Sequence, residues 1–172
     1  MYKRQTLRHP GIPLVYDVEE DLTNSYLIEE YLEGESLYAL VKRLGSLSMK
    51  TAAEIGIQVC RLIQFMNTAD NPILYLDLQP KNLLVCNGAV RLIDFDHAQY
   101  AEDVTAFGER YGTIGFAAPE QYRGEPLDCR TDVYAIGALL YYMCRGEPPG
   151  NGFCLGDRSD TWELDRIIRG CM

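Results

Sequence analysis

The sequence predicts a single α+β domain, in which short strands come first and helices dominate the rest of the chain. Three observations predict this class. Two strand-like runs flank a turn near the N-terminus, apolar runs flank Asn87-Gly88, and apolar residues gather at helical spacing over 49–66 and 132–144. With 172 residues, 47% of them hydrophobic and 24% charged, the chain can bury one hydrophobic core.

The N-terminal elements are predicted to be a β-hairpin followed by a short helix. Residues 12–18 and 25–30 are strand-like, and the polar stretch 21–24 between them favours a turn. Gly34 ends the second strand, and a helix is expected over 36–44.

A long amphipathic helix is predicted over 49–66, because its apolar residues recur at steps of three and four. Ser48 is placed to cap its N-terminus, and Asn71-Pro72 stops it. A second helix, over 132–144, is almost wholly apolar and must be buried; it ends at Gly146. A last amphipathic segment covers 162–169, and a helical start is expected after Pro119.

The middle of the chain holds short, very apolar runs at 73–76, 83–85 and 90–95. Asn87-Gly88 joins the last two, and this dipeptide favours a tight hairpin because both residues tolerate positive φ. Periodicity fades over 96–115, which is expected to be a long loop. A loop of that length in a compact domain is usually functional.

Composition restricts the partners and the compartment. A formal charge of −9 argues against nucleic acid as a partner, because a general nucleic-acid binder has a basic face. No apolar run reaches the ~18 residues of a membrane helix. We expect a cytoplasmic domain with free thiols, although a membrane anchor elsewhere in a longer protein is compatible with this; the cysteines show no Cys-x-x-Cys pair and are Cys60, Cys86, Cys129, Cys144, Cys154 and Cys171.

Three polar residues beside the central apolar runs form a candidate site. Asp77 lies between two leucines, Asn82 follows five residues later, and Asp94 closes the run 90–94. The Asn87-Gly88 hairpin folds these segments against each other, so the three side chains should converge. Two oxygen ligands for a cation and a free carboxylate that serves as a base are what a magnesium-nucleotide site needs.

Four motifs extend this observation. Residues 75–84 read YLDLQPKNLL, 94–96 read DFD, 112–120 read GTIGFAAPE and 132–137 read DVYAIG. In this order and at these separations they resemble the catalytic loop, the metal-binding motif, the end of the activation segment and the central helix of serine/threonine protein kinases, with the bacterial eukaryotic-like type as the nearest match. The resemblance implies a protein-kinase-like fold.

The resemblance implies a role for each residue of the candidate site. Asp77 would accept or orient the proton of the substrate hydroxyl, while Asn82 and Asp94 would hold magnesium ions that bridge the ATP phosphates. Thr113 would hydrogen-bond Asp77. ATP, Mg²⁺ and a protein serine or threonine hydroxyl are therefore the implied cofactors and substrate.

The resemblance also implies an adenine site and two structural contacts. Backbone groups of Glu30 and Leu32 would face adenine and Ser36 the ribose, with the alternative that Ser36 only caps the next helix. Leu84 would form the apolar floor beneath the base. Asp132 would accept backbone N–H groups of the catalytic loop, and Glu120 would pair with an arginine late in the domain.

The catalytic loop departs from the family pattern at Tyr75 and Leu76, where the family has His and Arg. Loss of the arginine argues against switching by phosphorylation of the activation loop, which makes Thr105 a poor phosphorylation site. Tyr75 is expected to pack beneath Phe95, the structural role of the missing histidine.

Other departures concern charge. Gln79 replaces the lysine that neutralises the transferred phosphoryl group, and Lys81 is the candidate substitute. Asp96 replaces the glycine of the metal-binding motif, and Glu29 guards the back of the adenine pocket.

We expect residues 1–31 to be the end of the N-lobe and the hinge, and 32–172 to be a C-lobe that is incomplete at its C-terminus. This predicts a kinase domain truncated at both ends and inactive by itself, because the glycine-rich loop and its lysine would precede His9. The main alternative is a pseudokinase, an ATP-binding scaffold without significant phosphotransfer. A small-molecule phosphotransferase is a third reading, which residues 118–120 disfavour.

Overall fold

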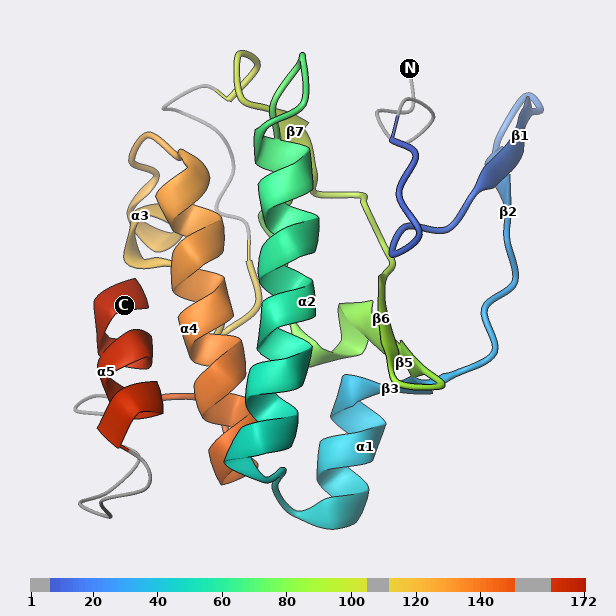
Figure 1. The fold of residues 1–172 in the computed structure, drawn as a ribbon. Helices are drawn as coiled ribbons and strands as arrows, with labels where there is room; N and C mark the ends of the chain where they lie inside the picture. The colour runs from blue at the N-terminus through green and yellow to red at the C-terminus, as the bar shows by residue number, and fades with distance from the viewer. Residues whose placement is uncertain (1–6, 105–111, 151–161) are drawn as a thin grey trace.

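The computed structural model describes residues 7–104, 112–150 and 162–172. Figure 1 shows a helical layer formed by α2 (Met49–Asn67), α4 (Cys129–Arg145) and α5 (Trp162–Cys171). The hairpin of β1 (Val15–Glu20) and β2 (Ser25–Glu29) lies at the opposite side of the molecule from α5. A three-stranded sheet and the α1 helix (Leu37–Leu44) lie between these two parts. The described residues form both helices and short antiparallel strands, in line with the α+β prediction.

Two helices form the centre of the core. α2 (Met49–Asn67) packs along α4 (Cys129–Arg145), and Gly56 allows the approach because a Cβ there would lie 2.7 Å from a methyl carbon of Leu140. Both predicted helices are therefore confirmed; α2 has the predicted Ser48 cap, whereas α4 begins three residues early, capped by Asp128. The fully buried side chains that fill this contact include Val59, Leu62, Met66, Leu139 and Met143.

The last helix, α5 (Trp162–Cys171), packs on the other side of α4. The contact is closest at Gly137, where a Cβ would lie 2.7 Å from the Cβ of Cys171. The sequence prediction of an amphipathic segment over 162–169 is confirmed, and Ile168 is its fully buried residue.

The N-terminal hairpin is also confirmed. β1 (Val15–Glu20) pairs antiparallel with β2 (Ser25–Glu29). The carboxylate of Asp21 accepts hydrogen bonds from the backbone N–H groups of Thr23 and Asn24, both at 2.8 Å, and these bonds hold its pKa well below the ordinary value. The turn therefore forms where its polar residues predicted it.

The central hairpin belongs to a three-stranded sheet that contacts helix α2. β5 (Leu83–Cys86) lies between β3 (Glu35–Ser36) and β6 (Ala89–Leu92), and the turn has φ of 50° at Asn87 and 82° at Gly88. The Gln58 side chain of α2 donates to the Gly88 carbonyl oxygen and accepts from the Val90 N–H. Helix α1 (Leu37–Leu44) follows β3 directly.

Two predicted strands are shorter than expected. β4 is Ile73–Leu74, not 73–76, and β6 ends at Leu92 rather than at residue 95. Each run is interrupted by a residue with positive φ, 67° at Leu76 and 60° at Asp94, a conformation incompatible with a strand. Such strained residues concentrate at functional sites, and both belong to the candidate site.

The expected loop 96–115 contains one strand that the sequence did not predict. β7 (Gln99–Tyr100) pairs antiparallel with β4. Helix α3 (Pro119–Arg123) begins at the predicted proline, after Ala118. Across the described residues, no helix is long and apolar enough to span a bilayer.

Candidate active site

Asp77 is the centre of a hydrogen-bond network between β4 and the short 3₁₀ helix η2 (Pro80–Asn82). One carboxylate oxygen accepts from the Thr113 hydroxyl at 2.8 Å. The other accepts from the side-chain amides of Gln79 at 2.8 Å and Asn82 at 3.0 Å. The structure thus brings together four of the residues that the sequence predicted. The three donors are neutral, so they fix the carboxylate without cancelling its charge.

The backbone before Asp77 is held by a buried carboxylate. Asp132, 1% exposed at the start of α4, accepts from the N–H groups of Tyr75 and Leu76, each at 2.9 Å. This confirms the anchoring contact expected from the resemblance. Burial raises the pKa of Asp132 to about 6, and the two backbone donors oppose that rise.

Gln121 has a structural role at the site that sequence reasoning missed. Its buried side chain donates to the Leu76 carbonyl oxygen at 2.9 Å and accepts from the Ala118 N–H at 2.9 Å. It therefore ties the end of segment 112–118 to the loop that carries Asp77. The available signal was weak, because Gln121 is one of several polar residues on this short helix.

Tyr75 connects the catalytic loop to the segment that contains Asp94. Its ring packs edge-on against Phe95 with centroids 5.3 Å apart, as predicted. The hydroxyl also donates toward the carbonyl oxygens of Ile93 and Asp94, at 2.5 and 2.8 Å. Burial raises the pKa of this hydroxyl well above its ordinary value, with a smaller contribution from the charges of Asp77 and Asp94. Tyr75 therefore stays a neutral donor.

Replacing Tyr75 with phenylalanine is expected to lower the free energy of unfolding by about 1–2 kcal/mol, because buried carbonyl oxygens lose their donor while the ring packing stays. Urea denaturation of wild type and variant measures this difference. Tyr16→Phe on the exposed hairpin is the matched control and is expected to change the free energy by less than about 0.5 kcal/mol. Equal values for both variants would contradict the structural role of the Tyr75 hydroxyl.

A cavity of about 460 Å³ lies beside this network. Four predicted site residues border it: Glu30, Leu32, Leu84 and Asp94. Glu29, expected to guard the back of the adenine pocket, borders it too. The remaining lining residues, which the sequence did not single out apart from Asp96, are Leu27, Tyr31, Ile93 and Asp96.

The side chain of Glu30 already has structural partners. Its carboxylate accepts from the Leu14 N–H at 3.2 Å and lies 3.7 Å from the Arg91 guanidinium. Its backbone N–H donates to the Leu14 carbonyl oxygen at 2.8 Å. If Glu30 meets a ligand through the main chain, its carbonyl oxygen is the group that remains.

Ser36 is placed differently from the other predicted nucleotide contacts. Its hydroxyl accepts from the Ala39 N–H at 3.1 Å, which caps α1, and its backbone pairs with Leu84. The capping alternative is thus confirmed, and the ribose contact stays a prediction.

Asn82 and Asp94 are suited to hold a divalent cation. Asn82 is 5% exposed and directs its amide nitrogen toward Asp77, so its amide oxygen is the atom a cation could take. The backbone carbonyl oxygen of Asn82 accepts from the Ile93 N–H at 2.9 Å, which fixes Asn82 near Asp94. Within the described ranges, no group of three or more His, Cys, Asp and Glu side chains could hold a metal. Two protein oxygens nevertheless suit Mg²⁺, which usually takes its other ligands from phosphates and water.

Among the described residues, no hydrogen bond or ion pair joins Lys81 to the Asp77 carboxylate. Its ammonium lies 5.6 Å from the centre of the Tyr38 ring on α1. Its expected role as the cation beside the phosphoryl group stays a prediction.

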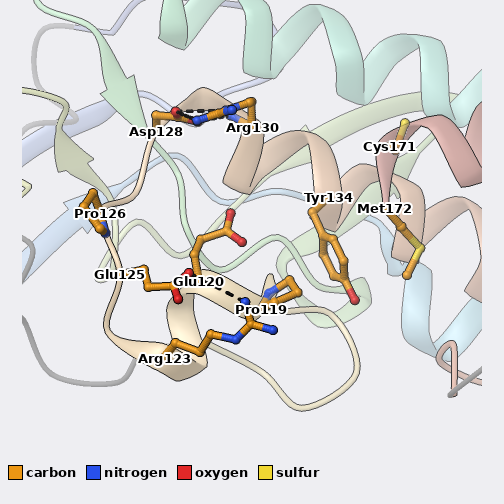
Figure 2. A pocket seen from close by; sticks show the side chains of 10 residues that line it. All are labelled: Pro119, Glu120, Arg123, Glu125, Pro126, Asp128, Arg130, Tyr134, Cys171 and Met172. Atoms are coloured by element: carbon orange, nitrogen blue, oxygen red, sulfur yellow. Dashed lines mark hydrogen bonds and ion pairs between the residues drawn. The ribbon is translucent and has the colours of Figure 1, made fainter.

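A larger cavity, of about 620 Å³, lies at the junction of α3, α4 and the end of α5. Figure 2 shows that its charged side chains face one another, with Arg123 beside Glu125 and Arg130 beside Asp128. Glu120, for which the resemblance implied an arginine partner late in the complete domain, accepts from the Thr131 hydroxyl at 2.9 Å. This cavity contains none of the predicted catalytic or metal-binding residues, so the smaller cavity is the candidate site.

The cysteines within the described residues form no disulfide. This agrees with the expectation of free thiols at Cys60, Cys86, Cys129, Cys144 and Cys171. Cys154 and Thr105 lie outside the described residues.

Comparisons with known proteins give a consistent result. A family model described as the protein kinase domain matches residues 2–161. The serine/threonine-protein kinase PknB of Mycobacterium tuberculosis is 35% identical over 155 residues, which cover 85% of this chain and 24% of the relative. PknB of Mycolicibacterium smegmatis is 36% identical over 152 residues (83% and 24%). A probable serine/threonine-protein kinase of Corynebacterium efficiens is 36% identical over 155 residues (85% and 23%). The chain spans about a quarter of the length of these relatives.

Proposed function

The chain belongs to the protein kinase family, and from this premise we propose that it forms the catalytic centre of a serine/threonine protein kinase. The proposed reaction transfers the γ-phosphoryl group of Mg-ATP to a protein hydroxyl. One observation carries the proposal. The Asp77 carboxylate is fixed by Thr113, Gln79 and Asn82, and the Asn82 backbone carbonyl oxygen accepts from the N–H of Ile93, which lines the cavity together with Asp94.

Asp77 serves as the base or orienting group for the acceptor hydroxyl in this proposal. Its neutral hydrogen-bond partners leave the carboxylate charged, and the Asp132 contacts fix the backbone that carries it. A residue that must receive a proton in a defined direction benefits from such rigidity, since catalysis depends on the position of the base.

Asn82 and Asp94 are the residues that would hold Mg²⁺, and Leu84, Glu30 and Leu32 would bind adenine. A bound Mg²⁺ would supply charge stabilisation on the transferred phosphoryl group. The cavity volume of about 460 Å³ supports this assignment, because it lies in the range of small-molecule sites. The wall of the cavity combines apolar Leu84 with the carboxylate of Asp94. This combination suits an adenine ring at one end and phosphates bound through Mg²⁺ at the other.

A pseudokinase is the second candidate, and the absence of charge around Asp77 supports it. Gln79 reaches Asp77 with a neutral amide, and Leu76 has no charge. The complete Asp77, Thr113 and Asn82 network favours the enzyme, because a binding module has no need to fix a carboxylate on three donors.

The arrangement also supports the proposed division of the chain. Residues 1–31 include the exposed hairpin and its connection to the cavity, and 32–172 include the helical layer. We assign the first part to the end of the N-lobe with the hinge and the second to the C-lobe. Because ATP is the proposed co-substrate, we place the reaction in the cytoplasm.

Phosphotransfer from γ-labelled ATP to a protein substrate tests the proposal. The assay uses the full-length protein that contains this domain. We expect magnesium-dependent label on serine or threonine, and a loss of at least about a hundredfold in Asp94→Asn, because this change removes a charged metal ligand. Asp103→Asn, the same change at an exposed position, is expected to retain wild-type activity. Magnesium-dependent nucleotide binding without any transfer would establish the pseudokinase. The absence of both nucleotide binding and transfer would overturn both candidates.

A further inference from the structure

Two lysines from different elements lie over one aromatic ring beside the catalytic loop. The ammonium of Lys42 lies 5.8 Å from the centre of the Tyr38 ring, and that of Lys81 lies 5.6 Å from it. Both distances are within the ~6 Å over which a cation is attracted to an aromatic face. We refer to Tyr38, Lys42 and Lys81 as the Tyr38 cluster.

The Tyr38 cluster is a local excess of positive charge on an acidic chain, whose net charge is −9. The neighbouring Arg43 is paired with Glu35 at 2.7 Å, and this contact lowers the pKa of Glu35. In the described part of the chain, neither Lys42 nor Lys81 has an acidic side chain within ion-pair distance. Two like charges held near one ring repel each other, so an anion between them would be stabilised.

The cluster lies beside the loop that carries Asp77. Lys81 belongs to η2, between Asp77 and Asn82, and α1 packs against η2. Lys42 and Lys81 are exposed, and Tyr38 is 39% exposed, so the cluster is open to a ligand.

The Tyr38 cluster is also linked to the segment 112–118. Burial raises the pKa of the Tyr142 phenol, and the Tyr38 phenol adds a smaller contribution in the same direction. Tyr142 packs on Phe116 with ring centroids 5.6 Å apart, and Phe116 donates its N–H to the Thr113 carbonyl oxygen. Because the Thr113 hydroxyl donates to Asp77, this route connects the cluster with the segment that helps to fix the carboxylate.

We propose that the Tyr38 cluster is a specificity site that binds an acidic side chain of the substrate, a few residues from the phosphorylated serine or threonine. The inference rests on the proposed kinase function. Lys42 and Lys81 supply the charge, and the attraction of each ammonium group to the Tyr38 ring keeps both near the same place. The chemistry selected is an anionic side chain, either a carboxylate or a phosphate already attached to the substrate.

Peptides of one sequence test this proposal, with a single position near the acceptor changed among aspartate, phosphoserine, glutamine and lysine. We expect kcat/KM about fivefold higher for aspartate than for glutamine, the order expected for one anion with two exposed cations, and a lower value still for lysine. A preference for phosphoserine over aspartate would identify a phosphorylated substrate as the source of the anion. The preference should shrink in high salt, because both lysines are exposed.

Lys42→Glu is the diagnostic variant, because Lys42 lies on α1 and outside the catalytic loop. It is expected to abolish or reverse the preference while the glutamine peptide keeps its rate. Lys50→Glu makes the same charge change at the start of α2 and should leave the preference intact. An unchanged preference in Lys42→Glu, or none in wild type, would overturn the proposal.

A binding measurement separates this inference from the proposed function. Fluorescence anisotropy of labelled aspartate and lysine peptides gives dissociation constants without any phosphotransfer. The aspartate peptide should bind at least about fivefold tighter than the lysine peptide, and Lys42→Glu should remove the difference. If transfer is absent but this difference holds, the kinase proposal fails and the site stands; if the peptides bind equally, the site is refuted whatever the activity.

Discussion

Asp77→Asn is expected to reduce phosphotransfer by about a hundredfold to ten-thousandfold, the range that a general base contributes. Asparagine keeps the shape of the side chain, so Thr113 can still donate to its oxygen. The amide cannot accept a proton, and its nitrogen faces the donors of Gln79 and Asn82, which now repel it. The loss should therefore appear mainly in kcat, with little change in the KM for ATP.

The control for this variant is Asp70→Asn, the same chemical change at an exposed turn after α2. It is expected to leave both kcat and KM unchanged. Steady-state kinetics with saturating magnesium measures the three proteins side by side. Equal turnover in wild type and Asp77→Asn would remove Asp77 from the reaction and leave the pseudokinase as the better reading.

Replacing Asp132 with alanine is expected to lower the free energy of unfolding at pH 7 by about 2–4 kcal/mol. The change leaves the backbone N–H groups of Tyr75 and Leu76 buried without acceptors, and each such donor costs about 1–3 kcal/mol. Relief of the buried charge offsets part of this loss. Urea denaturation measures it, and Asp103→Ala at an exposed position is the control, with an expected change under about 0.5 kcal/mol.

The pH dependence gives this prediction a definite sign. Burial raises the pKa of Asp132 from 3.8 to about 6, so the folded state binds the proton more tightly than the unfolded state. The resulting stabilisation is complete below about pH 4 and is lost as the pH rises through 6. The cost of Asp132→Ala should therefore be larger at pH 4 than at pH 7, and a cost that is independent of pH would contradict the raised pKa.

Local patterns were sufficient to predict most elements of the fold. The caps at Ser36 and Ser48, the Asn87-Gly88 turn and the buried helix that ends at Gly146 all rely on contacts within a few residues. The errors lie where distant segments intervene. β7 was missed because Gln99–Tyr100 becomes a strand only through pairing with β4.

The candidate site divides in the same way. The sequence directly provides the order and types of Asp77, Asn82 and Asp94, and the apolar character of Leu84. The contact between Thr113 and Asp77 was anticipated through a family resemblance, since 36 residues separate the two in sequence. The role of Gln121 had no local signal strong enough to predict it.

The sequence by itself therefore determined the family of this protein, the identity of its candidate base and metal ligands, and the helices that support them, because each depends on residue type and short-range spacing. The tertiary structure alone decided the positive φ of Leu76 and Asp94, the link from the Tyr75 hydroxyl to Asp94 and the meeting of Lys42 with Lys81 over Tyr38. The physical reason is that each of these features depends on contacts with segments that are distant in the sequence. A strained backbone persists only where tertiary contacts stabilise it, and two lysines 39 positions apart meet only when α1 packs on η2.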